Sequence, residues 1–418
     1  MRLPLKKILL AYVPMVSLIL WMGCGGERLA PTAEAGSKIY LSQAQFFMEK
    51  GADGKMHAVP GPARLIIYRR AEAGWVEEVL EDPESNVFHK AAFWDPPAGD
   101  PGVLTIAATQ AYLKIWRKGD SGWESESFWN PTFGGNFDRL RDFEVADVSG
   151  DGREDIVVAT HDQGVVAVVS WVNGTVHAEG VCRTKDTFVH EIEVGDVDGD
   201  GACEIFATPS QPNKLDGSSQ PGRIDMWDFR DRHWAHRGVD VLETCHAKEI
   251  LCVTLTGEER PVLIASLEGE RPGSRDPGDS TRIRLYRFEG DEIVSSDIAS
   301  LPGQLCRFLT HGDTDGDGAK ELIASTKDDG IWKITPVPGR STGDWKKKLI
   351  ADGTSGFEHA TYLCDLDDDG IDEIYVASDD QGEFRCYWFN GKDYSYDVIG
   401  TFADHPITFN VTAYRPPR

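Results

Sequence analysis

Residues 196–209 read DVDGDGACEIFATP, and three other segments of the chain repeat this pattern. They are DVSGDGREDIVVAT from Asp147, DTDGDGAKELIAST from Asp313 and DLDDDGIDEIYVAS from Asp365. In each copy, oxygen-bearing side chains alternate along a glycine-containing turn, and a short run rich in β-branched residues follows at once. Such a run is typical of a β-strand rather than a helix. The chain is therefore expected to repeat one strand-based unit.

A second signal lies between these segments: short apolar runs that end in an aromatic residue. It recurs seven times from Tyr68 to Trp388, about 53 residues apart on average. A unit of about 50 residues has room for four strands with their turns. Seven such units predict an all-β fold, a seven-bladed β-propeller with four-stranded blades, over residues 60–418. The segment His405–Arg415 is left over by this count and is predicted to close the ring by pairing with the strand near Leu65–Tyr68.

The alternating carboxylates predict metal sites. Three carboxylates within five residues repel one another unless a cation lies among them, and hard oxygen ligands at this density suit Ca²⁺. Glycine at the sixth position allows the tight turn. About four sites are expected, and the first, where Ser149 replaces a carboxylate, is expected to bind Ca²⁺ most weakly. The predicted side-chain ligands are Asp147, Ser149, Asp151 and Asp155; Asp196, Asp198, Asp200 and Glu204; Asp313, Asp315, Asp317 and Glu321; and Asp365, Asp367, Asp369 and Glu373. A backbone carbonyl at the seventh position completes each shell, and these belong to Arg153, Ala202, Ala319 and Ile371.

The D-x-D-x-D-G-x-x-[D/E] loop inside a β-repeat resembles the FG-GAP/VCBS class of calcium-binding propeller repeats, which is found in integrin α heads and many bacterial surface proteins. The resemblance covers roughly residues 60–415. It implies that the loops are structural and hold the first two strands of a blade together. It says little about function. The weaker copies of the repeat near Asp95 and Val253 lack the acidic pattern, so no metal is expected there.

The amino terminus has the features of an export signal. Residues 1–23 combine a positive start with an apolar stretch that is too short to span a bilayer comfortably. They end in Gly23-Cys24, which resembles the cleavage motif of bacterial lipoproteins, so Cys24 is the predicted lipidation site. Residues 24–59 are then a tether and N-terminal extension. The protein is expected to be exported and lipid-anchored at the cell envelope, in contact with the membrane through that anchor only.

The charge balance narrows the classes of partner. The chain has 418 residues, with 43 Lys and Arg against 69 Asp and Glu, which gives a net charge of −26. Nucleic-acid binding depends on clustered basic residues, so DNA and RNA are not expected partners.

Basic residues nevertheless recur at one position of the repeat. A His or Arg lies six residues before each acidic segment or weaker copy, and the closing strand also begins with a His. In a propeller these positions are the starts of the innermost strands, at the face opposite the acidic loops. Such a ring would attract an anion. The predicted ligand-binding residues are His89, Arg141, His190, His246, Arg307, His359 and His405.

Three functions are consistent with this pattern. The preferred one is non-enzymatic recognition of a glycan or protein ligand, which can be anionic, at the cell surface. The first alternative is a polysaccharide lyase acting on a uronic-acid glycan, with His190, His246 or His359 as base and Arg307 neutralising charge. The second is a purely structural role in surface assembly. No nucleophile motif such as G-x-S-x-G occurs in the chain, and no single residue is predicted to be catalytic.

Overall fold

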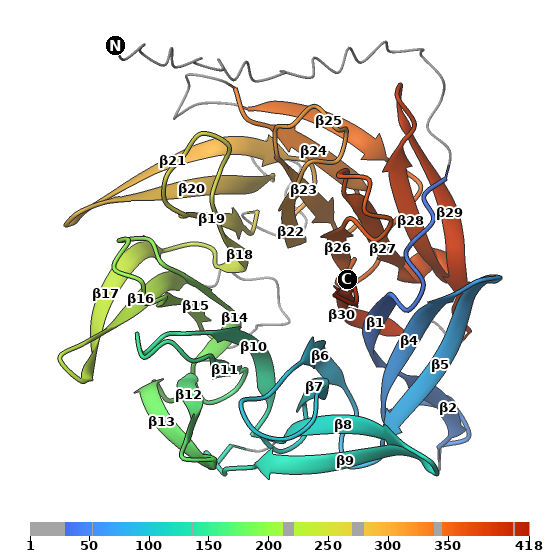
Figure 1. The fold of residues 1–418 in the computed structure, drawn as a ribbon, viewed down its shortest axis with the longest axis horizontal. Coiled ribbons are helices and arrows are strands. Elements are labelled where there is room, and N and C mark those ends of the chain that lie inside the picture. Colours follow the sequence, from blue (N-terminus) through green and yellow to red (C-terminus); the bar gives the residue numbers. More distant parts are fainter. Residues whose placement is uncertain are drawn as a thin grey trace, which may run out of the picture.

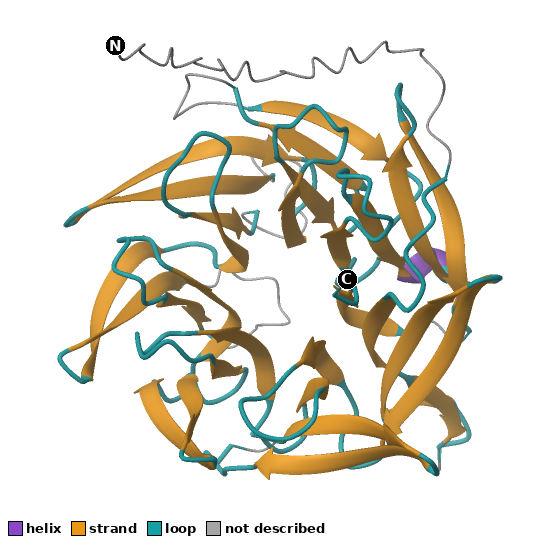
Figure 2. Cartoon of the chain, viewed as in Figure 1, coloured by secondary structure: helices purple, strands orange, loops and turns teal. Residues whose placement is uncertain are grey.

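The computed structural model describes residues 30–417 except 52, 136–137, 212–220, 270–279, 338–344 and 404–405. The described residues form seven four-stranded antiparallel sheets, arranged as a ring around a central axis (Figure 1). Almost all regular structure is strand (Figure 2). The predicted seven-bladed β-propeller is therefore confirmed.

Six blades are each continuous in sequence, from the innermost strand to the outermost. Their strands are β6 (Phe88–Trp94), β7 (Gly102–Ala107), β8 (Leu113–Gly119) and β9 (Gly122–Trp129); β10 (Leu140–Ala146), β11 (Asp155–Thr160), β12 (Val165–Val172) and β13 (Thr175–Arg183); β14 (Phe188–Gly195), β15 (Glu204–Ser210), β16 (Gly222–Arg230) and β17 (His233–Leu242); β18 (Ala247–Val253), β19 (Val262–Leu267), β20 (Thr281–Glu289) and β21 (Glu292–Leu301); β22 (Cys306–Gly312), β23 (Glu321–Thr326), β24 (Ile331–Thr335) and β25 (Lys346–Ala351); and β26 (Thr361–Cys364), β27 (Glu373–Ser378), β28 (Glu383–Phe389) and β29 (Tyr394–Thr401). A short 3₁₀ helix, η1 (Asp379–Gln381), follows β27.

The seventh blade joins the two ends of the described chain. Its strand order is β30 (Ile407–Tyr414), β1 (Lys38–Ala44), β4 (Ala63–Ala71) and β5 (Gly74–Asp82). The C-terminal strand therefore pairs with β1, and β1 pairs with β4. The predicted pairing of the closing strand with Leu65–Tyr68 was wrong by one strand, and the propeller includes residues before position 60. A hairpin of β2 (Phe46–Lys50) and β3 (Met56–Pro60) lies between β1 and β4 in the chain.

Burial follows from the stacking of the blades. The second strand of each of the six continuous blades is buried at every position, because one neighbouring blade covers each of its two faces. One of the core clusters, for example, packs Leu104 and Ile106 of β7 against Ile156 and Val158 of β11. The outermost strands are mostly exposed. The inner strands are therefore left to line the axis, where a site can form.

Candidate metal loops and central channel

The four acidic segments connect the first and second strands of their blades, as predicted. We call them loop 1 (147–155), loop 2 (196–204), loop 3 (313–321) and loop 4 (365–373). In three of them the first, third and ninth residues bring one carboxylate oxygen each within 4.8 Å of the others. These triads are Asp196, Asp198 and Glu204; Asp313, Asp315 and Glu321; and Asp365, Asp367 and Glu373. Three of the loops can therefore hold a metal ion.

The first aspartate shapes each loop. In loop 2, Asp196 Oδ1 accepts hydrogen bonds from the backbone N–H groups of Gly199 (2.6 Å) and Asp200 (3.1 Å), and Oδ2 accepts one from Gly201 (3.1 Å). Gly201 has a φ of +95°, which a side chain would strain. Asp147, Asp313 and Asp365 make equivalent bonds in their own loops. The turn is thus wrapped around one carboxylate, and the other acidic side chains converge beside it.

Several acidic oxygens in these loops are buried and accept no hydrogen bond. They include Asp155 Oδ2, Glu204 Oε1 and Asp315 Oδ1. Asp155 and Glu204 are 4% and 1% exposed. Burial raises the pKa of Asp155 to about 6 and that of Glu204 to about 7. A buried carboxylate oxygen without a hydrogen-bond partner is costly, and a bound cation would remove that cost. The residues therefore fit a hard divalent cation.

Loop 1 has a weaker donor set, in keeping with its serine. Its acidic residues do not form one of the convergent triads found in the described chain. Arg153 also donates a hydrogen bond from its side chain to Asp151. That loop 1 binds metal most weakly stays a prediction.

A cavity of about 770 Å³ lies on the axis of the ring. All seven inner strands contribute to its lining, which extends from His89 and Arg141 at the strand starts to Asp95 and Glu154 at the acidic-loop face. Aromatic rings, including those of Phe143, Phe308 and Tyr362, line it together with polar groups. This volume is in the range of small-ligand sites.

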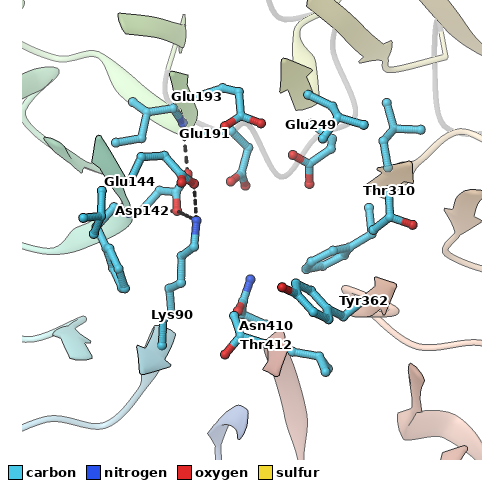
Figure 3. Close-up of a pocket in the computed structure, with 18 of the residues that line it drawn as sticks. Lys90, Asp142, Glu144, Glu191, Glu193, Glu249, Thr310, Tyr362, Asn410 and Thr412 are labelled. Atoms are coloured by element: carbon cyan, nitrogen blue, oxygen red, sulfur yellow. Dashed lines mark hydrogen bonds and ion pairs between the residues drawn. The ribbon is translucent and has the colours of Figure 1, made fainter. Parts of the chain in front are cut away.

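The cavity is rich in carboxylates. These residues were not among the ligand-binding residues predicted from the sequence. Asp142, Glu144, Glu191, Glu193 and Glu249 line it, and they come from three neighbouring blades (Figure 3). Lys90 Nζ donates to Asp142 Oδ1 at 3.0 Å and also to Glu144. Burial is the largest cause that raises the pKa of Glu191, Glu193 and Glu249 above its ordinary value. The carboxylates can accept hydrogen bonds from hydroxyl or amino groups of a ligand.

A β-bulge explains why basic and acidic neighbours share this region. The pairing of β10 with β11 shifts between Leu140 and Asp142, next to Arg141. The pairing of β14 with β15 shifts in the same way between Val189 and Ile192. A bulge re-aims side chains that would otherwise alternate between the two faces of a strand. The channel carboxylates have one signal in the sequence, which is a basic residue followed by two acidic residues, as in Arg141-Asp-Phe-Glu144.

The predicted basic ring lies at the starts of the inner strands. His89, Arg141, His190 and Arg307 are near the first residues of β6, β10, β14 and β22. His246 immediately precedes β18, and His359 lies two residues before β26. Residue His405 lies outside the described residues. Ligand binding by this ring stays a prediction, and four of its members, His89, Arg141, Arg307 and His359, hydrogen-bond within the protein.

The two arginines are held in one buried ion-pair network. Arg307 Nη1 donates to both carboxylate oxygens of Glu358, at 3.1 and 3.0 Å. Arg141 Nη2 donates to Glu191 at 3.0 Å and lies 3.8 Å from Glu358. The Glu358 side chain is only 3% exposed. Both guanidinium charges are therefore already neutralised inside the protein.

The four described histidines of the ring are buried. Burial lowers the pKa of His89 and of His190, and nearby Arg141 contributes in both cases. His89 donates from Nδ1 to the carbonyl of Leu140 at 2.6 Å. The ring of His190 lies 4.9 Å from that of His246, whose Nε2 is 2.6 Å from Glu268 Oε2.

His359 is bound at both ring nitrogens. Its Nδ1 donates to the carbonyl of Thr326, and its Nε2 accepts from Thr354 Oγ1, both at 2.8 Å. A positive electrostatic potential at this ring is thus weaker than the residue types suggest.

Other predictions fall outside the described residues. They are the signal segment 1–23 and the lipidation site Cys24. Within the described residues, no helix is long and apolar enough to cross a bilayer. The seven cysteines of the described chain are all free thiols.

Comparison with known proteins adds information on the fold. No family model matches the chain, and no curated protein matches it significantly in sequence. Among solved structures, it is similar to a candidate 6-phosphogluconolactonase from Bacteroides fragilis, with a TM-score of 0.51 and 10% sequence identity. The alignment covers 91% of this chain and 98% of that chain. At this identity the likeness supports the architecture alone.

Proposed function

We propose that this chain is an exported, calcium-stabilised propeller that recognises a glycan or protein ligand in its central channel without catalysing a reaction. The observation that carries the proposal is the axial cavity of about 770 Å³, to which every inner strand contributes. A site built from seven strands of a closed ring is rigid, which favours selective binding.

We further propose that the acidic loops take Ca²⁺ and are FG-GAP/VCBS-type repeats. The donors are carboxylates at alternating positions of a glycine turn, and hard oxygen donors of this kind suit Ca²⁺. In loop 2, Asp196, Asp198 and Glu204 would hold the ion. Bound there, it would supply charge neutralisation and join the end of β14 to the start of β15.

The lining of the cavity favours one chemistry of ligand. Its seven acidic residues outnumber Lys90 and Arg141, and both of these cations are already bound to carboxylates. An anionic glycan would find no unpaired ammonium or guanidinium group in this lining. Carboxylates accept hydrogen bonds from sugar hydroxyls and attract amino groups, and aromatic rings pack against the apolar faces of sugars. A neutral or amine-bearing glycan is the ligand that this lining fits best.

The lyase alternative finds less support in this geometry. The bases that it would use, His190, His246 and His359, do not line the cavity, and they are 3%, 1% and 0% exposed. A catalytic base must reach the proton that it removes. Release of unsaturated sugar by the purified protein would restore that alternative. Association of the chain with itself in place of ligand binding would support the structural-assembly alternative.

The channel proposal predicts that Tyr362→Ala weakens binding by at least about tenfold, since it removes an aromatic face from the cavity. Tyr362 lies between β22 and β30 in the lining (Figure 3). The measurement is calorimetric titration with the best glycan from an array screened in the presence of Ca²⁺. Tyr396→Ala is the matched control, because Tyr396 lies on the outer strand β29 and is 48% exposed. Equal affinity of the wild type and Tyr362→Ala would refute the channel as the site.

The proposed lipid anchor also fixes an orientation. Glu34 N–H donates to the carbonyl of Leu366 in loop 4 at 2.7 Å, so the described chain starts at the acidic-loop face. Pro31 lines a small pocket at this face. Cys24 lies seven positions before Pro31 in the sequence, and seven residues span at most about 25 Å. A lipidated protein would therefore hold its calcium loops toward the membrane.

Replacing Cys24 tests the anchor. We expect Cys24→Ala to lose incorporation of radiolabelled palmitate in a bacterial host and to move from the membrane fraction to the soluble fraction. Cys182→Ala is the control, because Cys182 is a free thiol on β13 within the propeller. Unchanged labelling of Cys24→Ala would show that the anchor proposal is wrong.

A further inference from the structure

Basic side chains contact all four acidic loops, but those at loops 1, 2 and 4 belong to Arg153, Arg230 and Arg415, whose side chains are 54%, 57% and 38% exposed. Loop 3 differs in that its basic side chain is mostly buried and binds two carboxylates of the triad. Lys333, on β24, is 10% exposed at its side chain. Its Nζ donates to Glu321 Oε1 at 2.8 Å and also to Asp315. Two of the three acidic residues in this triad are thus already bound to an ammonium group.

Strand register shows that this contact is particular to one blade. Lys333 pairs with Ile323, two residues after Glu321. The residues that pair at the equivalent position beside loops 1, 2 and 4 are Val168, Met226 and Cys386. All three are buried and carry no charge. Loops 1, 2 and 4 therefore have no counterpart of Lys333 at this position.

The oxygens of the ninth residue differ accordingly. In loop 2, Glu204 Oε2 accepts from Val197 N–H at 2.8 Å, while Oε1 is buried and accepts no hydrogen bond. In loop 3, Glu321 Oε2 accepts from Thr314 Oγ1 at 3.0 Å, and Oε1 is bound by Lys333. The oxygen that is unpartnered in loop 2 is therefore occupied in loop 3.

We infer that Lys333 is the resident cation of loop 3 and that this loop does not take up calcium, whereas loops 2 and 4 do. A divalent ion entering the triad would meet the ammonium charge at close range. Moving that ammonium away would leave it without its two carboxylate partners in a mostly buried place, which is strongly unfavourable. The inference rests on the calcium proposal for the acidic loops. In loop 3, the ammonium group of Lys333 therefore takes the place of a metal ion at any calcium concentration.

The test is the number of calcium ions bound per chain, measured by equilibrium dialysis and elemental analysis. We expect Lys333→Met, which restores the residue type of Met226, to bind one more ion than the wild type. Lys348→Met is the control: Lys348 lies on β25 of the same blade, is 51% exposed and pairs with Asp393, and its replacement should leave the count unchanged.

A second pair of variants keeps the test decisive if Lys333→Met fails to fold. Asp315→Asn should leave the calcium count of the protein unchanged, while Asp198→Asn, at the same position of loop 2, should lower it by one. Loss of one ion in Asp315→Asn, or no gain in folded Lys333→Met, overturns the inference while the calcium proposal stands. No loss in Asp198→Asn and in Asp367→Asn overturns the calcium proposal and, with it, this inference.

Discussion

Removal of calcium with excess EGTA is expected to lower the midpoint of thermal unfolding by about 10 °C. Each ion that binds only the folded chain contributes about 2.7 kcal/mol when its concentration is 100 times its dissociation constant. Loss of the two ions expected in loops 2 and 4 destabilises the protein by about 5 kcal/mol, and each kcal/mol shifts the midpoint of a large domain by a few degrees at most. Differential scanning fluorimetry at matched ionic strength measures the effect.

The control for this prediction is EGTA that has been saturated with calcium, which should leave the midpoint unchanged. Magnesium should restore little of the lost stability, because it is smaller and demands near-octahedral geometry. A midpoint of thermal unfolding that does not respond to EGTA would contradict the claim that loops 2 and 4 bind calcium in the folded state.

Combined replacement of Arg141 and Arg307 by alanine is expected to destabilise the fold by about 3–5 kcal/mol. Both arginines contact Glu358, whose side chain is 3% exposed, so their loss leaves a buried carboxylate without its cations. Urea unfolding at neutral pH, followed by tryptophan fluorescence, gives the free energy of unfolding. Such a loss would show that the two arginines of the predicted ligand-binding ring stabilise the fold.

Two comparisons sharpen that result. Glu358→Gln added to the double variant should recover part of the loss, because the buried charge is removed. Lys348→Ala breaks an exposed pair with Asp393 and should cost less than about 1 kcal/mol. A double variant that is no less stable than Lys348→Ala would contradict the role of the buried network.

The fold was predictable because its repeated unit is visible in the chain. The turn of loop 2 and the buried strand after it recur in register, and a strand that is buried on both faces needs a neighbouring blade on each side. The closing pair was predicted wrongly because β1, the second strand of its blade, is not preceded by an acidic turn of the kind found in loops 1 to 4. Its segment KIYLSQA is followed by a separate hairpin, so a count of repeats begins only at β4.

The site was predictable only in part. The acidic loops are local in sequence, so alternating carboxylates were enough to locate them. The channel is not local: Arg141 and Asp142 are neighbours that alternation would place on opposite faces, and a bulge changes this. The ammonium of Lys333 in loop 3 depends on the register between β23 and β24. Such contacts are set by tertiary structure and have no short motif.

The most direct test of the account is a crystal structure determined from calcium-containing solution, with anomalous diffraction recorded at long wavelength. We predict an anomalous peak within about 2.6 Å of carboxylate oxygens of Asp196, Asp198 and Glu204, with an equivalent peak in loop 4. Loops 2 and 4 without any such peak, in a propeller that is otherwise intact, would contradict the claim that calcium stabilises this ring.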